Sequence, residues 1–232
     1  MPILPTDPFD MATPFVRLYD PSRDFTNGLH VFFTTIDQGL DYEPARTIGS
    51  HIWYKPYVSV TPDTCFVLDD GTGRVVGYCI GAADTTTFAQ RWREEFTPLV
   101  DPALVPRPEV RSDDPLMEKD YIKGFREAVY NAHCSMLQPW PESSQAYPAH
   151  LHIDILPEFQ RQGHGKALIN AFSEAVKSRG AKGVHLDMVQ HNTNGRAFYE
   201  RVGFQLCSQV LDGGESGQTG VNGIVVTLVK SL

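Results

Sequence analysis

The stretch from residue 150 to residue 189 constrains the fold of this chain more than any other part of it. "HLHIDIL" has the pattern of a strand, "PEFQRQ" that of a loop, and "GVHLDMV" that of a buried strand. Between them, "GHGKALINAFSEAVKSRG" has apolar residues at the spacing of an amphipathic helix, and it ends at Gly180, a residue type that commonly terminates helices. We therefore predict one βαβ unit and a protein of the α/β class.

The loop before this helix, "QRQGHGK", runs from Gln160 to Lys166 and combines two glycines with basic side chains. Free N–H groups and the positive dipole end make the start of a helix attractive to anions, and glycines let the backbone approach a pyrophosphate closely. Arg161 and Lys166 add positive charge, and His164 adds a further donor. The loop therefore predicts an anion-binding site.

A dinucleotide-binding unit would begin in a similar way. Asp187 even lies about 20 residues beyond the glycines, where such a unit places its ribose-binding carboxylate. However, Leu168 occupies the position of the third glycine, and "PEFQRQ" separates the strand from the glycines where the dinucleotide fold has a tight turn. These departures disfavour a dinucleotide site.

Further strands and helices are predicted around this unit. "FVRLYD" reads as a first strand, residues 25–40 have helical spacing, and a second helix holds "IGSHIW" before "YKPYVSVTPD" breaks the pattern. "CFVLDDGTGRVVGYCIGA" reads as a hairpin. The chain then continues, after helical pieces in residues 84–147, with the elements of the βαβ unit and with "NGRAFYERV" as a helix, "GFQLCSQVL" as a strand, "DGGESGQTG" as a glycine-rich loop and "GIVVTLV" as a last strand.

Composition limits the classes of function that remain. With 232 residues, 41% of them hydrophobic, the chain can bury one sizeable core. Its formal charge of −8 argues against a nucleic-acid surface, and the sequence has neither a signal-like start nor an apolar run of membrane-spanning length. Four separated cysteines without a CxxC pair indicate free thiols and no zinc site. We expect a soluble protein of the cytoplasm or nucleus that binds no metal.

Two motifs in order identify a family resemblance. "LPEFQRQGHG" and "NTNGRAFYERVGF" resemble the paired signatures of the GNAT superfamily of acyl-CoA-dependent N-acetyltransferases, in which a Gln/Arg-x-x-Gly-x-Gly/Ala loop is followed by an Asn and a Phe-Tyr-Glu-x-x-Gly-Phe stretch. The matching residues are Gln160, Gly163, Gly165, Asn192, Phe198, Tyr199, Glu200, Gly203 and Phe204. Each half alone is common, but both at this separation are a specific signal.

The resemblance extends to a subfamily. "IWYKPYVSVTPDTCFVLDD" and "YPAHLHIDILPEFQRQGHGKALI" are similar to the acetyltransferase-like domain of the O-GlcNAcase family and its stand-alone microbial relatives, over most of residues 13–230. This likeness implies a GNAT fold over 1–232, a mixed and mostly antiparallel sheet of about seven strands flanked by helices. Residues 1–12 would form an N-terminal arm, and 84–147 a helical insertion between the third and fourth strands.

The resemblance also implies where acetyl-CoA binds. The main chain of the glycine loop would hold the pyrophosphate, and the strand at 150–155 would splay from its neighbour so that pantetheine lies in the gap. The N–H near Ile155 would then stabilise the developing oxyanion, a contribution of about 3–4 kcal/mol in comparable sites. The implied cofactor residues are Ile155, Gln160, Arg161, Gln162, Gly163, His164, Gly165, Lys166, Asn192 and Phe198.

Proton transfer needs separate groups. An amine with a lysine-like pKa must first become neutral, which costs about 4.6 kcal/mol at neutral pH, so a base is useful. "HLHID" places His150, His152 and Asp154 on one face of a strand. We favour Asp154 as the base with His152 as its partner or alternative, while buried histidines satisfied by the backbone remain the competing interpretation. Tyr199 matches the family tyrosine that protonates the departing thiolate.

The sequence thus predicts an acetyl-CoA-dependent N-acetyltransferase that acts directly on a primary amine, such as a small amine, an amino sugar or a lysine side chain. The alternative is a catalytically weak or inactive module of the O-GlcNAcase type that binds acyl-CoA for recognition. We expect a monomer or homodimer without nucleic-acid or membrane partners. Aromatic residues around Trp53, Tyr54 and Tyr57 are expected to form a wall of the acceptor site.

Overall fold

The computed structural model describes residues 13–132, 145–211, 215–219 and 223–232. An eight-stranded sheet runs through it in the order β1-β2-β3-β4-β5-β8-β6, and β7 also pairs with β8. The strands are β1 (Phe15–Leu18), β2 (Phe66–Asp69), β3 (Val75–Ala82), β4 (Ala149–Ile155), β5 (Gly183–Val189), β6 (Gln205–Leu206), β7 (Gln218–Thr219) and β8 (Val225–Ser231). Because β4 and β5 are the parallel pair in an otherwise antiparallel sheet, the predicted fold class is confirmed.

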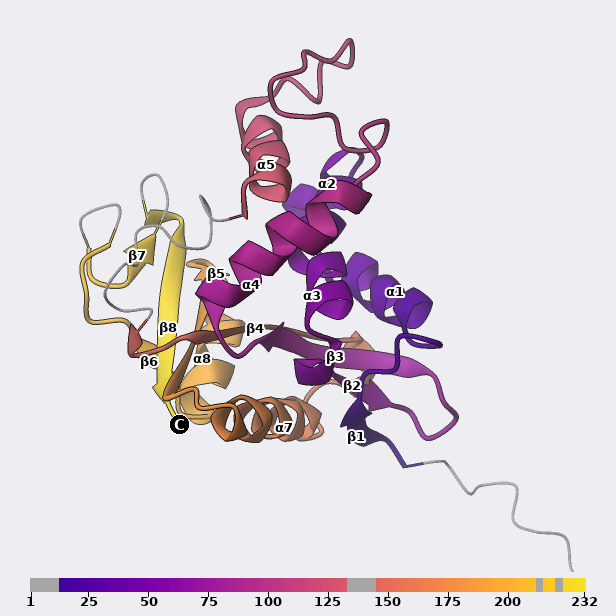
Figure 1. The fold of residues 1–232 in the computed structure, drawn as a ribbon. Coiled ribbons are helices and arrows are strands. Elements are labelled where there is room, and N and C mark those ends of the chain that lie inside the picture. Colours follow the sequence, from indigo (N-terminus) through magenta and orange to yellow (C-terminus); the bar gives the residue numbers. More distant parts are fainter. Residues whose placement is uncertain (1–12, 133–144, 212–214, 220–222) are drawn as a thin grey trace, which may run out of the picture.

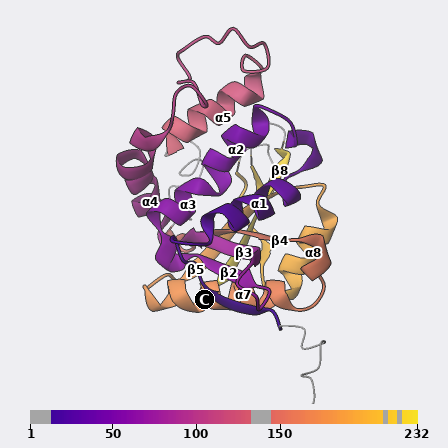
Figure 2. The same cartoon turned by 90° about the vertical axis from the view of Figure 1, so that its right-hand side faces the viewer.

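Helices cover both faces of the sheet. Helices α1, α2, α3 and α5 lie on one side and α7 on the other (Figures 1 and 2). Their bounds are α1 (Phe25–Thr35), α2 (Ala45–Trp53), α3 (Lys55–Val60), α4 (Thr85–Arg91), α5 (Asp120–Tyr130), α7 (His164–Ser178) and α8 (Thr193–Arg201). Short 3-10 turns at Gln38–Leu40, Pro62–Thr64, Thr97–Leu99 and Pro157–Phe159, and a π-helical turn at Trp92–Phe96, complete the helical segments described here. None of the described helices is long and apolar enough to cross a membrane.

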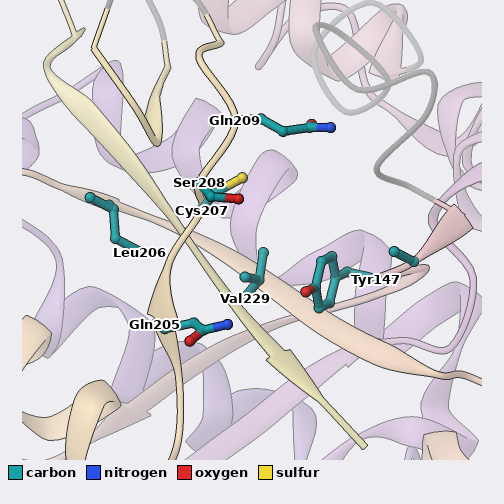
Figure 3. Close-up of a pocket in the computed structure, with 8 residues that line it drawn as sticks. Tyr147, Gln205, Leu206, Cys207, Ser208, Gln209 and Val229 are labelled. Atoms are coloured by element: carbon teal, nitrogen blue, oxygen red, sulfur yellow. The ribbon is translucent and has the colours of Figure 1, made fainter.

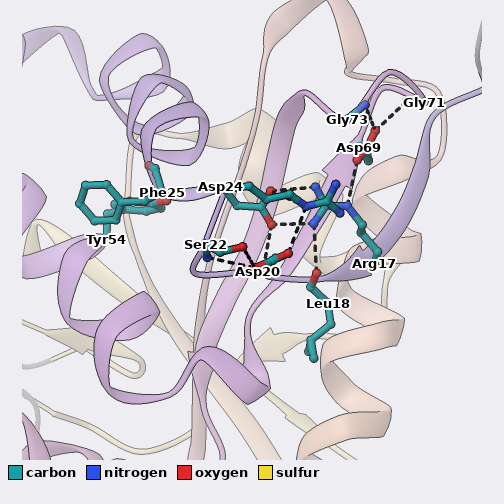
Figure 4. A network of polar contacts seen from close by, with 11 residues as sticks. Arg17, Leu18, Asp20, Ser22, Asp24, Phe25, Tyr54, Asp69, Gly71 and Gly73 are labelled. Atoms are coloured by element: carbon teal, nitrogen blue, oxygen red, sulfur yellow. Dashed lines mark hydrogen bonds and ion pairs between the residues drawn. The ribbon is translucent and has the colours of Figure 1, made fainter.

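An ion-pair network fixes the first strand to its neighbours. The Arg17 guanidinium on β1 donates to both carboxylate oxygens of Asp24, at 2.6 and 2.8 Å, and its Nε donates to Asp69 at 2.9 Å (Figure 4). Asp24 is fully buried directly before α1, and Asp69 closes β2. Arg17 therefore joins the start of α1 to the edge of the sheet. Replacing Arg17 would leave the buried carboxylate of Asp24 without its positively charged partner.

Strand β3 forms the centre of the core, with all eight residues buried. At Gly81 the neighbouring chain comes very close: a Cβ atom would lie 2.1 Å from the His150 carbonyl oxygen and 2.7 Å from the Phe172 ring. A glycine is therefore needed where α7 packs over the β3–β4 pair.

We expect Gly81→Ala to lower the free energy of unfolding by at least about 1–3 kcal/mol, because backbone atoms of β4 cannot move aside without breaking the sheet. Urea denaturation measures the change. Gly124→Ala is the matched control, since Gly124 is exposed on α5 with no atom within 4 Å of the added Cβ. It should leave stability unchanged or raise it by up to about 1 kcal/mol. Equal effects of the two variants would contradict this account of Gly81.

Several predicted elements are confirmed and others are corrected. The hairpin, the helix after the glycine loop and the helical segment between the third and fourth strands are present. The predicted break at "YKPYVSVTPD" is wrong, because α3 forms there with Pro56 in its first turn, where a helix needs no N–H donor. The first helix ends at Thr35 rather than continuing to residue 40.

Near the C-terminus, the sequence predicted too long a strand and missed another. The strand expected from "GFQLCSQVL" shortens to β6, and part of the predicted glycine-rich loop pairs with β8 as β7. Tertiary pairing to β8 decides both lengths, which a local pattern does not encode. The N-terminal arm at 1–12 and part of the insertion, 133–144, lie outside the described residues.

Candidate functional site

The central feature of the candidate site is an opening between β4 and β5. Strand β4 pairs with β3 along its length, but it meets β5 only through the register pairs Ala149↔Val184 and His150↔His185. Strand β5 is meanwhile paired to β8 over all seven of its residues. In the described part of the chain, the edge of β4 beyond His150 therefore has no strand partner on its β5 side.

The ladder geometry shows which backbone groups point into this opening. Leu156 donates its N–H to the Val76 carbonyl of β3. Because hydrogen-bonding direction alternates along an antiparallel strand, the N–H groups of Ile155, Ile153 and Leu151 point away from β3 and towards β5. The splayed strand that the family resemblance implied is thus present, with the Ile155 N–H on the open side.

The glycine loop ends next to this opening. Arg161 has a φ of 60° and Gly163 a φ of 88°, and Gly163 caps α7 without a side-chain hydrogen bond. In the described residues, the main-chain N–H groups from Arg161 to Lys166 have no hydrogen-bond acceptor. These unpaired donors, with the exposed Arg161 and Lys166 side chains, make the loop a site for an anion.

The two glycines of the loop are required for different structural reasons. Gly163 adopts the left-handed backbone region, and no atom lies within 4 Å of where its Cβ would be. At Gly165 a Cβ would lie 2.9 Å from the Phe198 ring, so this glycine lets α8 pack against the start of α7. His164 adds a buried Nε2 with no hydrogen-bond partner among the described residues.

The other residues predicted to bind cofactor have local hydrogen-bond partners. Gln160 donates from Nε2 to the Ile155 carbonyl at 2.7 Å, and Gln162 donates to the Glu158 carbonyl at 2.8 Å. Asn192 caps α8, because its Oδ1 accepts from the Gly195 N–H at 2.8 Å. Asn192 was expected to contact the cofactor, and its Nδ2 has no hydrogen-bond partner among the described residues.

A row of polar side chains follows β4 on the face that is covered by α1 and α3. His150, His152 and Asp154 lie on one face, as the period-two spacing predicted, with Tyr78 opposite Asp154 on β3. The Tyr78 hydroxyl donates to Asp154 Oδ2 at 2.6 Å. Tyr57 Oη of α3 lies between the two histidines, 2.9 Å from His150 Nε2 and 3.1 Å from His152 Nε2.

Burial shifts the protonation equilibria of this row. It raises the pKa of Asp154, against hydrogen bonds from Tyr78 and Thr35 that lower it. It also lowers the pKa of His152 to about 4, with a smaller contribution from the charge of His185, and it lowers the pKa of His150 well below its ordinary value. At neutral pH both histidines are therefore neutral, and the carboxyl group of Asp154 has a more basic character than an exposed aspartate.

Tyr199 of α8 is electrostatically linked to the same row. Its half-buried ring packs against Phe198 and Phe204, with centroid distances of 5.3 and 5.8 Å. Burial raises the pKa of the Tyr199 phenol, and the negative charge of Asp154 raises it further. The phenol thus stays protonated at neutral pH.

Sequence reasoning missed several members of the site. Tyr78 lies within the apolar strand "VVGYCIGA", and Thr85 begins α4, so neither carries a sequence signal of its own. Tyr57 was expected in a wall of the site. Its side chain is buried and stacks on Phe88 with a centroid distance of 4.6 Å, so only its hydroxyl contributes to the polar row.

A separate hollow of about 300 Å³ lies beside β6 and β8 (Figure 3). It contains none of the predicted site residues. The link to the polar row is indirect: Val229 pairs with His185 in register, and His185 Nδ1 lies 2.7 Å from the Tyr147 carbonyl oxygen. The lining residues are Ala146, Tyr147, Gln205, Leu206, Cys207, Ser208, Gln209 and Val229. We place the candidate site at the β4–β5 opening, where the polar groups converge.

Comparison with known proteins agrees with this geometry. Residues 127–206 match the model of the acetyltransferase (GNAT) domain family. The crystal structure of SsHAT is similar to this chain with a TM-score of 0.75 and 35% sequence identity, over 94% of this chain and 98% of that one. PH1933 from Pyrococcus horikoshii OT3 shares the fold, with a TM-score of 0.50 and 14% identity over 94% of this chain and 98% of that chain. An opened parallel strand pair next to a glycine loop, together with these matches, shows that the chain belongs to the GNAT acetyltransferase family and is an acyltransferase.

Proposed function

We propose that this protein transfers an acetyl group from acetyl-CoA directly to a primary amine of a small amine, an amino sugar or a lysine side chain. The observation that carries the proposal is the open edge of β4 next to the unpaired N–H groups of residues 161–166. The sequence likeness to the acetyltransferase-like domain of the O-GlcNAcase family is the basis for assigning a subfamily. We also propose a monomer or homodimer of the cytoplasm or nucleus.

The residues present fit acetyl-CoA. The N–H groups of the glycine loop and the charges of Arg161 and Lys166 suit a pyrophosphate, and the orphaned His164 Nε2 offers one more polar contact. Amide groups of a pantetheine can pair with the open backbone of β4, and the Phe198 ring lies against Gly165 near the end of that strand. Asn192 Nδ2, which has no partner among the described residues, is a further candidate donor. When bound, acetyl-CoA supplies an activated acetyl group as a thioester.

The side chains then have separate functions in the transfer. Asp154, with His152 as partner or alternative, accepts a proton from the amine, and its raised pKa favours that function. The amine nitrogen forms its bond to the acetyl carbon as the carbon–sulfur bond breaks. The Ile155 N–H donates to the oxygen that gains negative charge, and the protonated Tyr199 phenol donates its proton to the departing thiolate.

A panel of amines, read by release of the CoA thiol, tests the proposal. Thiol release that depends on both acetyl-CoA and an amine supports direct transfer. Calorimetric binding of acetyl-CoA without thiol release across the panel would instead support the alternative, an acyl-CoA-binding recognition module. Absence of acetyl-CoA binding in the micromolar to millimolar range would contradict both.

The basic side chains of the loop give a separate prediction. We expect the double variant Arg161→Gln/Lys166→Gln to bind acetyl-CoA about tenfold more weakly, because charge-assisted contacts to the pyrophosphate are lost. Calorimetry measures the dissociation constant. Lys182→Gln is the matched control, since Lys182 is exposed next to β5 and outside the loop. An equal loss in the control variant would indicate a general charge effect.

A further inference from the structure

The side chains of the polar row are joined by hydrogen bonds whose directions can be worked out from their partners. Thr85, His150, Tyr57 and His152 form one hydrogen-bonded chain that begins at the Pro148 carbonyl oxygen and ends at His152. Thr85 is the first residue of α4, which lies between β3 and β4 in the sequence, whereas Tyr57 belongs to α3, which precedes β2. The direction of each hydrogen bond in this chain follows from the one before it.

The chain starts at an acceptor that has no proton. Thr85 Oγ1 lies 2.8 Å from the Pro148 carbonyl oxygen, so the Thr85 hydroxyl must donate its single proton there. Thr85 Oγ1 also lies 2.7 Å from His150 Nδ1. Since Thr85 has no second proton, His150 must carry a proton on Nδ1 and donate it to Thr85.

The remaining protons are then assigned in turn. His150 is buried with no carboxylate within bonding distance among the described residues, so it is neutral and its Nε2 is an acceptor. Tyr57 must donate to His150 Nε2, at 2.9 Å. The oxygen of Tyr57 can then only accept from His152 Nε2, at 3.1 Å. His152 therefore carries its proton on Nε2, and its Nδ1 keeps a lone pair.

We propose that Thr85, acting through His150 and Tyr57, fixes the tautomer of His152 and so leaves His152 Nδ1 as the hydrogen-bond acceptor for the attacking amine. Thr85, His150 and Tyr57 are positioning residues. The assignment of the tautomer stands on the geometry alone, whereas the function given to Nδ1 rests on the proposed acetyl transfer. Among the described residues, no group is hydrogen-bonded to His152 Nδ1.

The groups next to this row of hydrogen bonds have partners of their own. His185, whose ring centroid lies 5.6 Å from that of His150, carries its own proton towards the Tyr147 carbonyl oxygen at 2.7 Å. Asp187 lies two residues from His185 on the same face of β5, and its carboxylate accepts a hydrogen bond from Thr227 on β8. Its charge acts on both His185 and Tyr57, but within the described part of the chain no hydrogen bond joins it to either residue. Stacking of Tyr57 on Phe88 at 4.6 Å keeps the phenol in place between the two histidines.

Long-range ¹H–¹⁵N correlation spectra of the histidine side chains test the assignment without any substrate. Near neutral pH, we expect His150 to show a protonated Nδ1 and His152 a protonated Nε2, with signals assigned through His150→Gln and His152→Gln. A wild-type His152 with its proton on Nδ1 would overturn the proposal.

Two variants test the direction of control. In Thr85→Val, His150 loses the acceptor for its Nδ1 proton. It can then carry its proton on Nε2 and donate to Tyr57, whose hydroxyl in turn donates to His152 Nε2. The Nδ1-protonated form of His152 should therefore appear. In Tyr57→Phe, His150 should keep its Nδ1 proton while His152 loses its fixed tautomer. Thr64→Val is the control. Thr64 is also buried, but its hydroxyl donates to the Gly81 carbonyl oxygen at 2.6 Å and takes no part in the hydrogen bonds of the polar row. Unchanged spectra in Thr85→Val would overturn the proposal.

Turnover provides the second readout. With an amine acceptor from the panel, Thr85→Val should lower kcat and leave the KM for acetyl-CoA unchanged, while Thr64→Val should change neither. An altered His152 tautomer with unchanged kcat would overturn the positioning function. A wild-type protein without turnover contradicts the proposed acetyl transfer instead, and the spectra still decide the tautomer.

Discussion

Asp154→Asn should lower kcat by about 10²–10⁴-fold while the KM for acetyl-CoA stays close to that of the wild type. Asparagine keeps an oxygen that accepts from Tyr78, so the row of side chains and the fold should be preserved. What the variant loses is the group that takes the amine proton. Steady-state thiol release with the best amine of the panel measures kcat, and urea denaturation checks that stability is retained.

The pH profile sharpens this test. Burial raises the pKa of Asp154, and the base must be deprotonated, so wild-type kcat/KM should fall as the pH decreases through that raised value. The hydrogen bond from Tyr78 lowers the pKa of Asp154, so Tyr78→Phe should move the acidic limb to higher pH. Asp154→Asn should abolish the limb. An acidic limb that survives in Asp154→Asn but disappears in His152→Gln would identify His152 as the base.

Tyr199→Phe should produce the second large loss, about 10²-fold in kcat, because the departing thiolate would have to take its proton from water. Because burial and the charge of Asp154 raise the pKa of the phenol, the wild type should show no alkaline limb from Tyr199 below about pH 10. Thiol release measured against pH checks both statements.

Tyr121→Phe is the matched control for the loss of a phenol, since Tyr121 is exposed on α5. Acetyl-CoA binding by calorimetry separates loss of cofactor from loss of chemistry, because Phe retains the ring that packs on Phe198 and Phe204. Full turnover in Tyr199→Phe would exclude this tyrosine as the acid.

Local patterns predicted those parts of the fold that depend on neighbours in sequence. The helix at residues 164–178 and the hairpin of β2 and β3 were recognisable because apolar periodicity and turn residues are encoded within each segment. The polar face of β4 followed from the two-residue period in the same way. Helix α3 was missed because the proline and aromatic residues of "YKPYVSV" have little local helix preference, and its packing against the core decides its conformation.

The sequence alone determined the family, the glycine loop and the three polar positions on β4, since these are properties of motifs and spacing. Only the tertiary structure decided that Gly165 is required by the Phe198 ring, that Tyr57 joins the two histidines, and that Tyr78 bonds to Asp154. The physical reason is sequence separation. Tyr57 lies 93 residues from His150 and Tyr78 lies 76 residues from Asp154, so no local pattern relates them. Folding of the sheet brings these hydroxyls to the polar row, where burial makes their hydrogen bonds specific.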